Sequence, residues 1–314
     1  MDWRHPEILV IVASLSLVPP AARAQQASIA EISLDALRVQ AEVPKPGNNL
    51  AFGFGSLWVV HRTEVTRVLA ADNSYKDIPI EGSTGRVRDL AVGEGGIWVP
   101  DVGNRTIYKI DPRSDKVVQK ISAEMFGVAG SIGVGEGSIW VVTGNDRVLT
   151  RFSATSGMVE ARIALPGDSA GVAVDYGSVW VTGNFRGELY RIDPKTNAIV
   201  QTTTLGRIPR SILSAYGSIW VFNWGSGTVQ KIDPVSGRVA ATIKAGLADD
   251  CGSFVAGGHY LWVLQSGTPV VQIDPGSEAA IRKVSGMELA RDIRFGAGSL
   301  WLAGESIKRI EEPN

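Results

Sequence analysis

Short apolar runs recur along the chain at a nearly constant interval, and each run contains one tryptophan. The tryptophans are Trp58, Trp98, Trp140, Trp180, Trp220, Trp262 and Trp301. The intervals between them are 40, 42, 40, 40, 42 and 39 residues. Most follow a glycine-serine pair, as in GSLWVV, GSIWVV and GSVWVT. A fixed period of about forty residues indicates a repeat architecture.

Each copy of the repeat divides into four short segments that suit β-strands. In the second copy we expect strands at 88–92, 97–99, 106–110 and 116–121. Glycines separate the first two segments, and an Asp-Pro turn at 111–115 separates the last two. The Asp-Pro pair recurs in three further copies, beginning at Asp193, Asp233 and Asp274. Four short antiparallel strands in about forty residues are typical of one blade of a β-propeller.

The two ends of the chain are expected to share the last blade. After Trp301 the sequence has room for only one more strand, at 306–310. The missing fourth strand is supplied by residues 37–44, which resemble the fourth strands at 158–165 and 239–244. The prediction is an all-β fold over residues 37–314. It is a seven-bladed β-propeller of four antiparallel strands per blade, closed by its N-terminal strand in a 3+1 arrangement. The periodic tryptophans should pack between blades.

The N-terminal residues have the pattern of an export signal. An apolar run covers residues 8–18, and Ala22, Arg23 and Ala24 form an A-x-A cleavage site. We expect residues 1–24 to be removed, residues 25–36 to form a lead-in, and the mature protein to be periplasmic or secreted. The apolar run is too short to span a bilayer, and no later segment is long and apolar enough to do so. An uncleaved membrane anchor is the alternative.

Composition narrows the classes of function. The formal net charge is −1, which argues against nucleic acid as a partner. The 36 glycines suit a turn-rich all-β protein. Cys251 is the single cysteine, so no internal disulfide can form. The sequence contains no Walker, HExxH, CxxC or GxSxG motif and no dinucleotide fingerprint. We expect a monomer whose partner is a peptide, a protein or a small molecule.

The loops of the blades divide into two faces with different variation. The loops joining the first strand to the second, and the third to the fourth, repeat almost unchanged and form the bottom face. The other loops form the top face and diverge between copies, which is where a ligand site is expected. Ten residues before the tryptophans stand Asn48, Arg88, Gly130, Ala170, Arg210, Gly252 and Arg291. Nine before stand Asn49, Asp89, Ser131, Gly171, Ser211, Ser253 and Asp292. Just after the second strands stand His61, Asp101, Asn145, Asn184, Asn223 and Gln265.

These positions give a set of candidate ligand-binding residues at the mouth of the central channel. The set is Arg88, Arg210, Arg291, Trp224, Asp101 and Asn223. A guanidinium suits carboxylate or phosphate groups, and an exposed tryptophan suits stacking. In the alternative interpretation no ligand is needed, because each of two Arg-Asp pairs is satisfied around the channel. These pairs are Arg88 with Asp89 and Arg291 with Asp292.

The amino-acid sequence of the repeat resembles that of a known group of propellers. Residues 217–243 read G-S-I-W-V, then T-V-Q-K-I-D-P-V-S-G-R-V-A-A-T-I after a short loop. They resemble the repeats of bacterial virginiamycin B lyase-like and YVTN (YncE-like) seven-bladed propellers, over nearly the whole mature chain. The resemblance implies that fold. For the lyase it also implies elimination from a cyclic depsipeptide, with Mg²⁺, histidine and glutamate at the central mouth.

Candidates for such chemistry are sparse in this sequence. The possible catalytic residues are His61, Glu288 and Asp292, and the possible ligands of Mg²⁺ or Ca²⁺ are Asn49, Asp89 and Asp292. His259 falls in a bottom-face turn. The leading hypothesis is therefore an exported propeller that binds a peptide, protein or small anionic ligand at its top mouth without catalysis. The alternatives are a metal-dependent lyase, or a lactonase with hard ligands that include Asn223.

Overall fold

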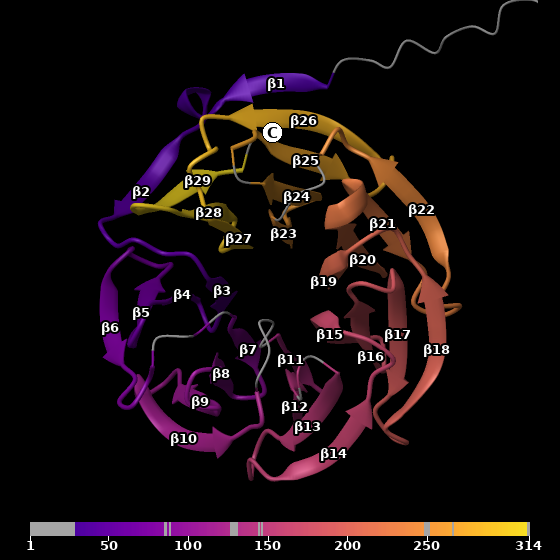
Figure 1. Ribbon diagram of the computed structural model, residues 1–314. Coiled ribbons are helices and arrows are strands. Elements are labelled where there is room, and N and C mark those ends of the chain that lie inside the picture. The colour runs from indigo at the N-terminus through magenta and orange to yellow at the C-terminus, as the bar shows by residue number, and fades with distance from the viewer. Residues whose placement is uncertain are drawn as a thin grey trace, which may run out of the picture.

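The computed structural model describes residues 29–84, 87, 89–125, 131–143, 145, 147–247, 252–265 and 267–312. In this part of the chain, seven sheets surround one central axis and form a closed ring (Figure 1). The predicted seven-bladed, all-β propeller is confirmed. The predicted signal peptide, Arg88 and Cys251 lie outside the described residues. Within the described ranges, no helix is long and apolar enough to cross a membrane.

In the first six blades, the four strands of the repeat succeed one another along the chain. In every blade the first strand lies nearest the axis (Figure 1). The first blade contains β3 (Leu50–Gly53), β4 (Ser56–Val60), β5 (Glu64–Leu69) and β6 (Tyr75–Pro79). The second contains β7 (Ala91–Gly93), β8 (Gly96–Asp101), β9 (Thr106–Asp111) and β10 (Lys116–Ser122). The third contains β11 (Ile132–Gly135), β12 (Ser138–Thr143), β13 (Val148–Ser153) and β14 (Val159–Ala164). The fourth contains β15 (Ser169–Asp175), β16 (Ser178–Gly183), β17 (Glu188–Asp193) and β18 (Ala198–Thr204).

The fifth and sixth blades follow the same order, and the seventh takes its fourth strand from the N-terminal part of the chain. The fifth contains β19 (Pro209–Ala215), β20 (Ser218–Asn223), β21 (Thr228–Ile232) and β22 (Val239–Lys244). The sixth contains β23 (Gly252–Gly257), β24 (Tyr260–Gln265), β25 (Val270–Asp274) and β26 (Ala279–Ser285). The seventh contains β27 (Asp292–Gly296), β28 (Ser299–Ala303), β29 (Ile307–Glu311) and, from the N-terminal part, β2 (Val39–Val43).

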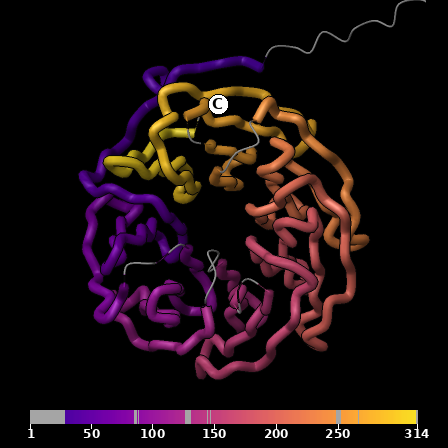
Figure 2. The backbone as a smooth tube through the Cα atoms, viewed as in Figure 1, coloured from indigo at the N-terminus to yellow at the C-terminus, as the bar shows by residue number. Residues whose placement is uncertain are grey.

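Closure of the ring follows the predicted 3+1 arrangement. Strand β2 pairs antiparallel with β29, from Val39 opposite Ile310 to Val43 opposite Ile307. The N-terminal strand thereby occupies the outer position that the C-terminal segment leaves open. Figure 2 shows the two ends of the colour range meeting in this blade. Pairing of the chain ends removes two strand edges that would otherwise be exposed.

The segment before the closing strand adds an element that the sequence analysis did not assign. Strand β1 (Ala30–Ser33) pairs parallel with β26, from Ala30 opposite Arg282 to Ser33 opposite Ser285. The 3-10 helix η1 (Leu34–Ala36) then leads to the seventh blade, and the Ser33 hydroxyl accepts a hydrogen bond from the Asp35 amide at its start. The sixth blade therefore has five strands. A four-residue strand lying outside the repeat carries too short a pattern to predict.

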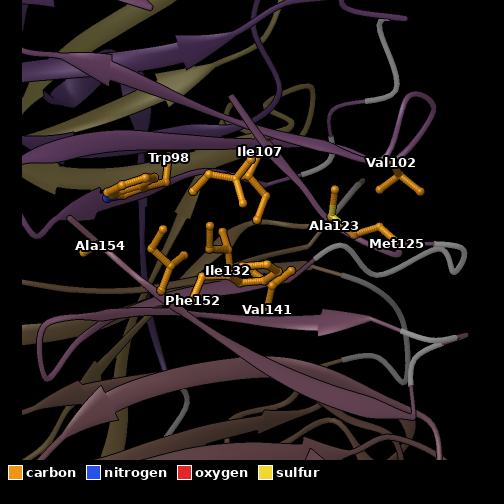
Figure 3. Packing of buried hydrophobic residues seen from close by; sticks show 11 residues of the cluster. Trp98, Val102, Ile107, Ala123, Met125, Ile132, Val141, Phe152 and Ala154 are labelled. Carbon is orange, nitrogen blue, oxygen red and sulfur yellow. The ribbon is translucent and has the colours of Figure 1, made fainter. Parts of the chain in front are cut away.

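The seven periodic tryptophans form the contacts between blades. Each is at most 1% exposed. Each indole Nε1 donates to the carbonyl five residues earlier, at 2.9–3.4 Å, and so ties the second strand to the end of the first. Figure 3 shows Trp98 of the second blade packed with Ile132, Val141 and Phe152 of the third. The predicted packing of tryptophan between adjacent sheets is confirmed.

A cation from the third strand covers the tryptophan ring in six blades, at 4.6–5.5 Å from the ring centroid. These cations are Arg67, Lys109, Arg151, Arg191, Lys231 and Arg309. Most also donate to a carbonyl in the outer turn of the next blade. Arg151 Nη1, for example, lies 2.5 Å from the Pro194 carbonyl. One side chain thus joins a tryptophan of one blade to the backbone of its neighbour.

The sixth blade departs from this pattern at Gln272, which lies opposite Trp262. Gln272 is fully buried, and neither atom of its amide has a hydrogen-bond partner in the described part of the protein. The reason lies in the closure. In the seventh blade β29 and β2 come from opposite ends of the chain, so no outer turn joins them to accept a cation from the sixth blade.

We expect the same substitution to have opposite effects at these two equivalent positions. Gln272→Met keeps the length of the side chain and removes two unpaired polar atoms, each of which costs about 1–3 kcal/mol when buried. Its midpoint of thermal unfolding should rise or stay unchanged. Arg151→Met removes the cation and leaves the Pro194 carbonyl without its donor, so its midpoint should fall by several degrees. Scanning calorimetry of both variants tests this. Equal losses would contradict the account of the sixth blade.

Candidate functional site

A cavity of about 790 Å³ opens at the mouth of the central channel, among the loops that precede the innermost strands. Every described member of the two residue sets predicted from the tryptophan register lines this cavity. These residues are Asn48, Asn49, Asp89, Ser131, Ala170, Gly171, Arg210, Ser211, Gly252, Ser253, Arg291 and Asp292. The register relative to the tryptophan fixes their position because each innermost strand starts at the same height in its blade. We call this the mouth cavity.

Arg210 and Trp224 form one wall of the mouth cavity. The Arg210 guanidinium lies 4.7 Å from the centroid of the Trp224 ring, and both residues line the cavity. Trp224 begins the 3-10 helix η2 (Trp224–Ser226) at the end of β20, and its backbone amide donates to the Ile208 carbonyl at 2.9 Å. Its indole Nε1 is buried and has no hydrogen-bond partner among the described residues. This wall combines a planar cation with an aromatic surface.

Asp292 is engaged within the scaffold. Its carboxylate is 3% exposed and accepts from the amides of Leu50 and Ile293, both at 2.8 Å. Its ion pair, at 2.8 Å, is with Arg294. The alternative pairing of Arg291 with Asp292 is therefore wrong. Arg291 is exposed at the rim, and no ion pair of its side chain occurs in the described ranges.

Arg294 lines the mouth cavity but was not among the predicted residues. A signal for it exists in the sequence. It stands seven residues before its tryptophan, where the other copies carry Ala51, Ala91, Gly133, Ala173, Leu213 and Val255. A charge that replaces small or apolar residues at one position of a repeat indicates a local role.

Asp89 accepts backbone amides in the same way as Asp292, two blades further round the ring. Its carboxylate accepts from the Leu90 amide at 2.9 Å and from the Ile132 amide of the next blade at 3.4 Å. Burial raises the pKa of Asp89 to about 6, and Arg294 opposes this shift. Both aspartates therefore link the innermost strands of neighbouring blades.

Asp101 and Asn223 do not line the mouth cavity, although they were predicted to bind ligand there. Asp101 is fully buried and accepts from Ser83 Oγ and from the amide and hydroxyl of Thr84, each at 2.7 Å. Asn223 is also fully buried, and its Nδ2 donates to Gln230 Oε1 at 2.9 Å. Both stand three residues after a tryptophan, at the last position of the second strand. They hold other parts of the chain in place, so assigning them to an open loop was wrong.

The three predicted catalytic residues do not meet in one cavity. Glu288 and Asp292 line the mouth cavity, whereas His61 lines an adjoining cavity of about 570 Å³. The two cavities share Asn48, Asn49 and Arg291 as lining residues. Glu288 Oε1 accepts from the Gly286 amide at 2.9 Å.

The donors present do not fit the divalent cation that the resemblance implies. No group of three histidine, cysteine, aspartate or glutamate side chains suited to a metal occurs in the described part of the chain. The oxygens of Asp89 and Asp292 accept backbone amides, and Asp292 also pairs with Arg294. An Mg²⁺ or Ca²⁺ site needs several oxygen ligands directed at one point. The predicted set of Asn49, Asp89 and Asp292 does not supply such a site.

Comparison with known proteins finds likeness in structure only. No family model and no curated protein matches the sequence. Among solved structures, virginiamycin B lyase from Staphylococcus aureus superposes with a TM-score of 0.76 at 14% identity, over 88% of this chain and 100% of that one. This chain has the fold of virginiamycin B lyase. A catalytically inactive variant of that enzyme with quinupristin gives 0.73 at 16% identity, over 88% and 98% of the two chains. A streptogramin B lyase gives 0.72 at 17%, over 86% and 94%.

We expect Asp89→Asn and Asp101→Asn to change stability with opposite dependence on pH. The pKa of Asp89 is raised by burial, so the wild type loses stability as the pH rises from about 4 through 6. Asp89→Asn avoids this loss, so its free energy of unfolding relative to the wild type should rise over that range by at most about 3 kcal/mol. Despite burial, hydrogen bonds from Thr84 and Ser83 lower the pKa of Asp101. Asp101→Asn should therefore destabilise most at neutral pH and progressively less below about pH 4.

Thermal midpoints of both variants and the wild type between pH 2.5 and 8 test this pair. The two difference curves should run in opposite directions. Parallel curves would contradict the assignment of Asp89 as a carboxyl whose ionisation is opposed by its surroundings.

Proposed function

We propose that this propeller binds a small anionic ligand or the end of a peptide or protein in its mouth cavity, without catalysing a reaction. The observation that carries the proposal is the Arg210–Trp224 wall, with Arg291 exposed on the same cavity. A guanidinium on an aromatic ring is positioned to pair with a carboxylate while the ring contacts the apolar part of the ligand. A cavity of about 790 Å³ falls within the range typical of ligand pockets.

The charges of the mouth cavity favour a ligand that carries more than one polar group. Asp292 is neutralised by Arg294, and Asp89 becomes neutral as the pH falls through about 6. Arg291 is without an ion pair in the described ranges. Glu288 and Glu305 also line the cavity and offer a counter-charge to a cationic group. Opposite charges at one mouth suit a peptide-like ligand better than a simple inorganic anion.

A lyase or a lactonase has less support. His61 lies in a different cavity from Glu288 and Asp292, and the oxygen donors expected for a metal are engaged within the scaffold. The structure of a virginiamycin B lyase variant with quinupristin supports the use of this fold to hold a ligand. We also propose export to the periplasm or beyond, on the sequence of residues 1–24.

We expect the full-length protein to bind N-acetylphenylalaninate, which carries a carboxylate and an aromatic ring. N-acetylphenylalaninamide is the matched neutral control. The acid should raise the thermal midpoint and change the Trp224 fluorescence, obtained as the difference from Trp224→Phe. At one hundred times its Kd a ligand stabilises by about 2.7 kcal/mol. The amide should give a clearly smaller effect at equal concentration.

The double variant Arg210→Gln, Arg291→Gln should lose at least tenfold in affinity for the acid. Its own midpoint without ligand should stay close to that of the wild type, because neither side chain covers one of the seven periodic tryptophans that hold the blades together. Arg210 covers Trp224 at the mouth instead. Equal binding of acid and amide, or an unchanged affinity of the double variant, would refute the proposed function. Adding Arg88→Gln extends the test to the third predicted arginine.

A further inference from the structure

His61 belongs to a chain of hydrogen bonds in which each donor and acceptor can be assigned. Lys45 Nζ donates to Asp77 Oδ2 at 2.5 Å, and Thr66 Oγ1 lies 2.6 Å from Asp77 Oδ1. Despite its burial, Asp77 has a pKa that hydrogen bonds from Lys45 and Thr66 lower, so it is a carboxylate and can only accept. The single hydroxyl proton of Thr66 is therefore directed at Asp77.

This order determines the tautomer of His61. Its Nε2 lies 2.8 Å from Thr66 Oγ1. Since the Thr66 proton is already donated, Nε2 must carry the hydrogen and Oγ1 must accept it. Burial lowers the pKa of His61, with Lys45 acting in the same direction and Glu64 and Asp77 against it. The neutral ring then presents Nδ1 as an acceptor with a free lone pair.

His61 lines the cavity beside the mouth, and its Nδ1 is accessible rather than buried. No hydrogen bond to it occurs in the described part of the protein, and it is not among the buried unpartnered atoms. The cavity of about 570 Å³ is also lined by Arg62, Glu64 and Arg291. Glu64 lies 3.8 Å from Lys45 Nζ and is paired with it. Arg62 and Arg291 thus give this cavity a positive balance next to a neutral acceptor.

We propose that the His61 cavity is a second subsite, which binds the amide N–H beside a ligand carboxylate held by Arg291. Arg291 lines both cavities, so a ligand in the mouth can place its carboxylate there and its neighbouring amide toward His61. The class of ligand is an N-acylated amino acid or the carboxyl end of a peptide. The inference rests on the proposed function because it uses Arg291 to hold the ligand carboxylate. It adds His61 as the acceptor for the ligand amide N–H.

Two matched probes isolate this hydrogen bond. N-acetylglycinate has the carboxylate and the N–H, whereas N-acetylsarcosinate replaces the N–H with N–CH₃. The ¹⁵N spectrum of the full-length protein should show His61 protonated at Nε2 before any addition. N-acetylglycinate should then move the Nδ1 resonance upfield and bind about threefold to tenfold more tightly than N-acetylsarcosinate, as expected for one added hydrogen bond.

Variants separate this subsite from the rest of the mouth. His61→Phe should bind both probes equally, and His61→Gln should restore part of the preference by offering an amide oxygen. Thr66→Val removes the acceptor of Nε2–H and should mix the two tautomers in the ¹⁵N spectrum. Arg291→Gln should weaken both probes. These variants keep the tryptophan of the first blade and its covering Arg67.

A His61 ring protonated at Nδ1, or equal binding of the two probes to the wild type, would overturn the second subsite. Binding of N-acetylphenylalaninate that still depends on Arg210 and Arg291 would leave the proposed function standing in that case. Loss of the dependence on Arg210 alone, with the dependence on Arg291 and the preference for N-acetylglycinate intact, would refute the Arg210–Trp224 wall and keep the His61 subsite.

Discussion

The structure depends on one contact that is repeated around the ring: a buried tryptophan held between neighbouring blades. Its indole N–H bonds the carbonyl five residues earlier, and its face is covered by a cation from the third strand in six of the blades. Where that cation also bonds the outer turn of the next blade, as Arg151 does, one side chain stabilises the seam through packing and a hydrogen bond together. The exception at Gln272 lies where ring closure leaves no turn to receive a cation.

The same repetition places the mouth of the channel. Because the tryptophan sets the height of each blade, every described residue nine or ten positions before it lines the mouth cavity. Asp89 and Asp292 use this position to bond the next innermost strand, so part of the polar lining holds the blades together. What remains for a ligand is asymmetric. Arg210 and Arg291 stand at the same position of the repeat in the fifth and seventh blades, and Trp224 covers only Arg210.

The sequence predicts those features that depend on the register to the tryptophan. The seven blades, the closing strand and the lining of the mouth follow from it. Asp101 and Asn223 were misplaced because the second strand extends three residues beyond the tryptophan, which makes its last residue part of the sheet. Arg294 was missed although its charge stands out among the apolar residues of the other copies. Strand β1 lies outside the repeat, and its parallel pairing with β26 depends on a tertiary contact that no local pattern encodes.

The residues three positions after the tryptophans show how a repeated scaffold acquires a local site. At this position Asp101, Thr143 and Asn223 bond neighbouring polar groups inside the protein. His61, which lines a cavity, does so with only one of its two ring nitrogens, and the other has no hydrogen bond in the described part of the protein. A side chain with two separate polar atoms can meet the needs of the fold with one and remain available through the other. A specific site is therefore compatible with the seven-fold scaffold, because it needs no change to the contacts that hold the blades.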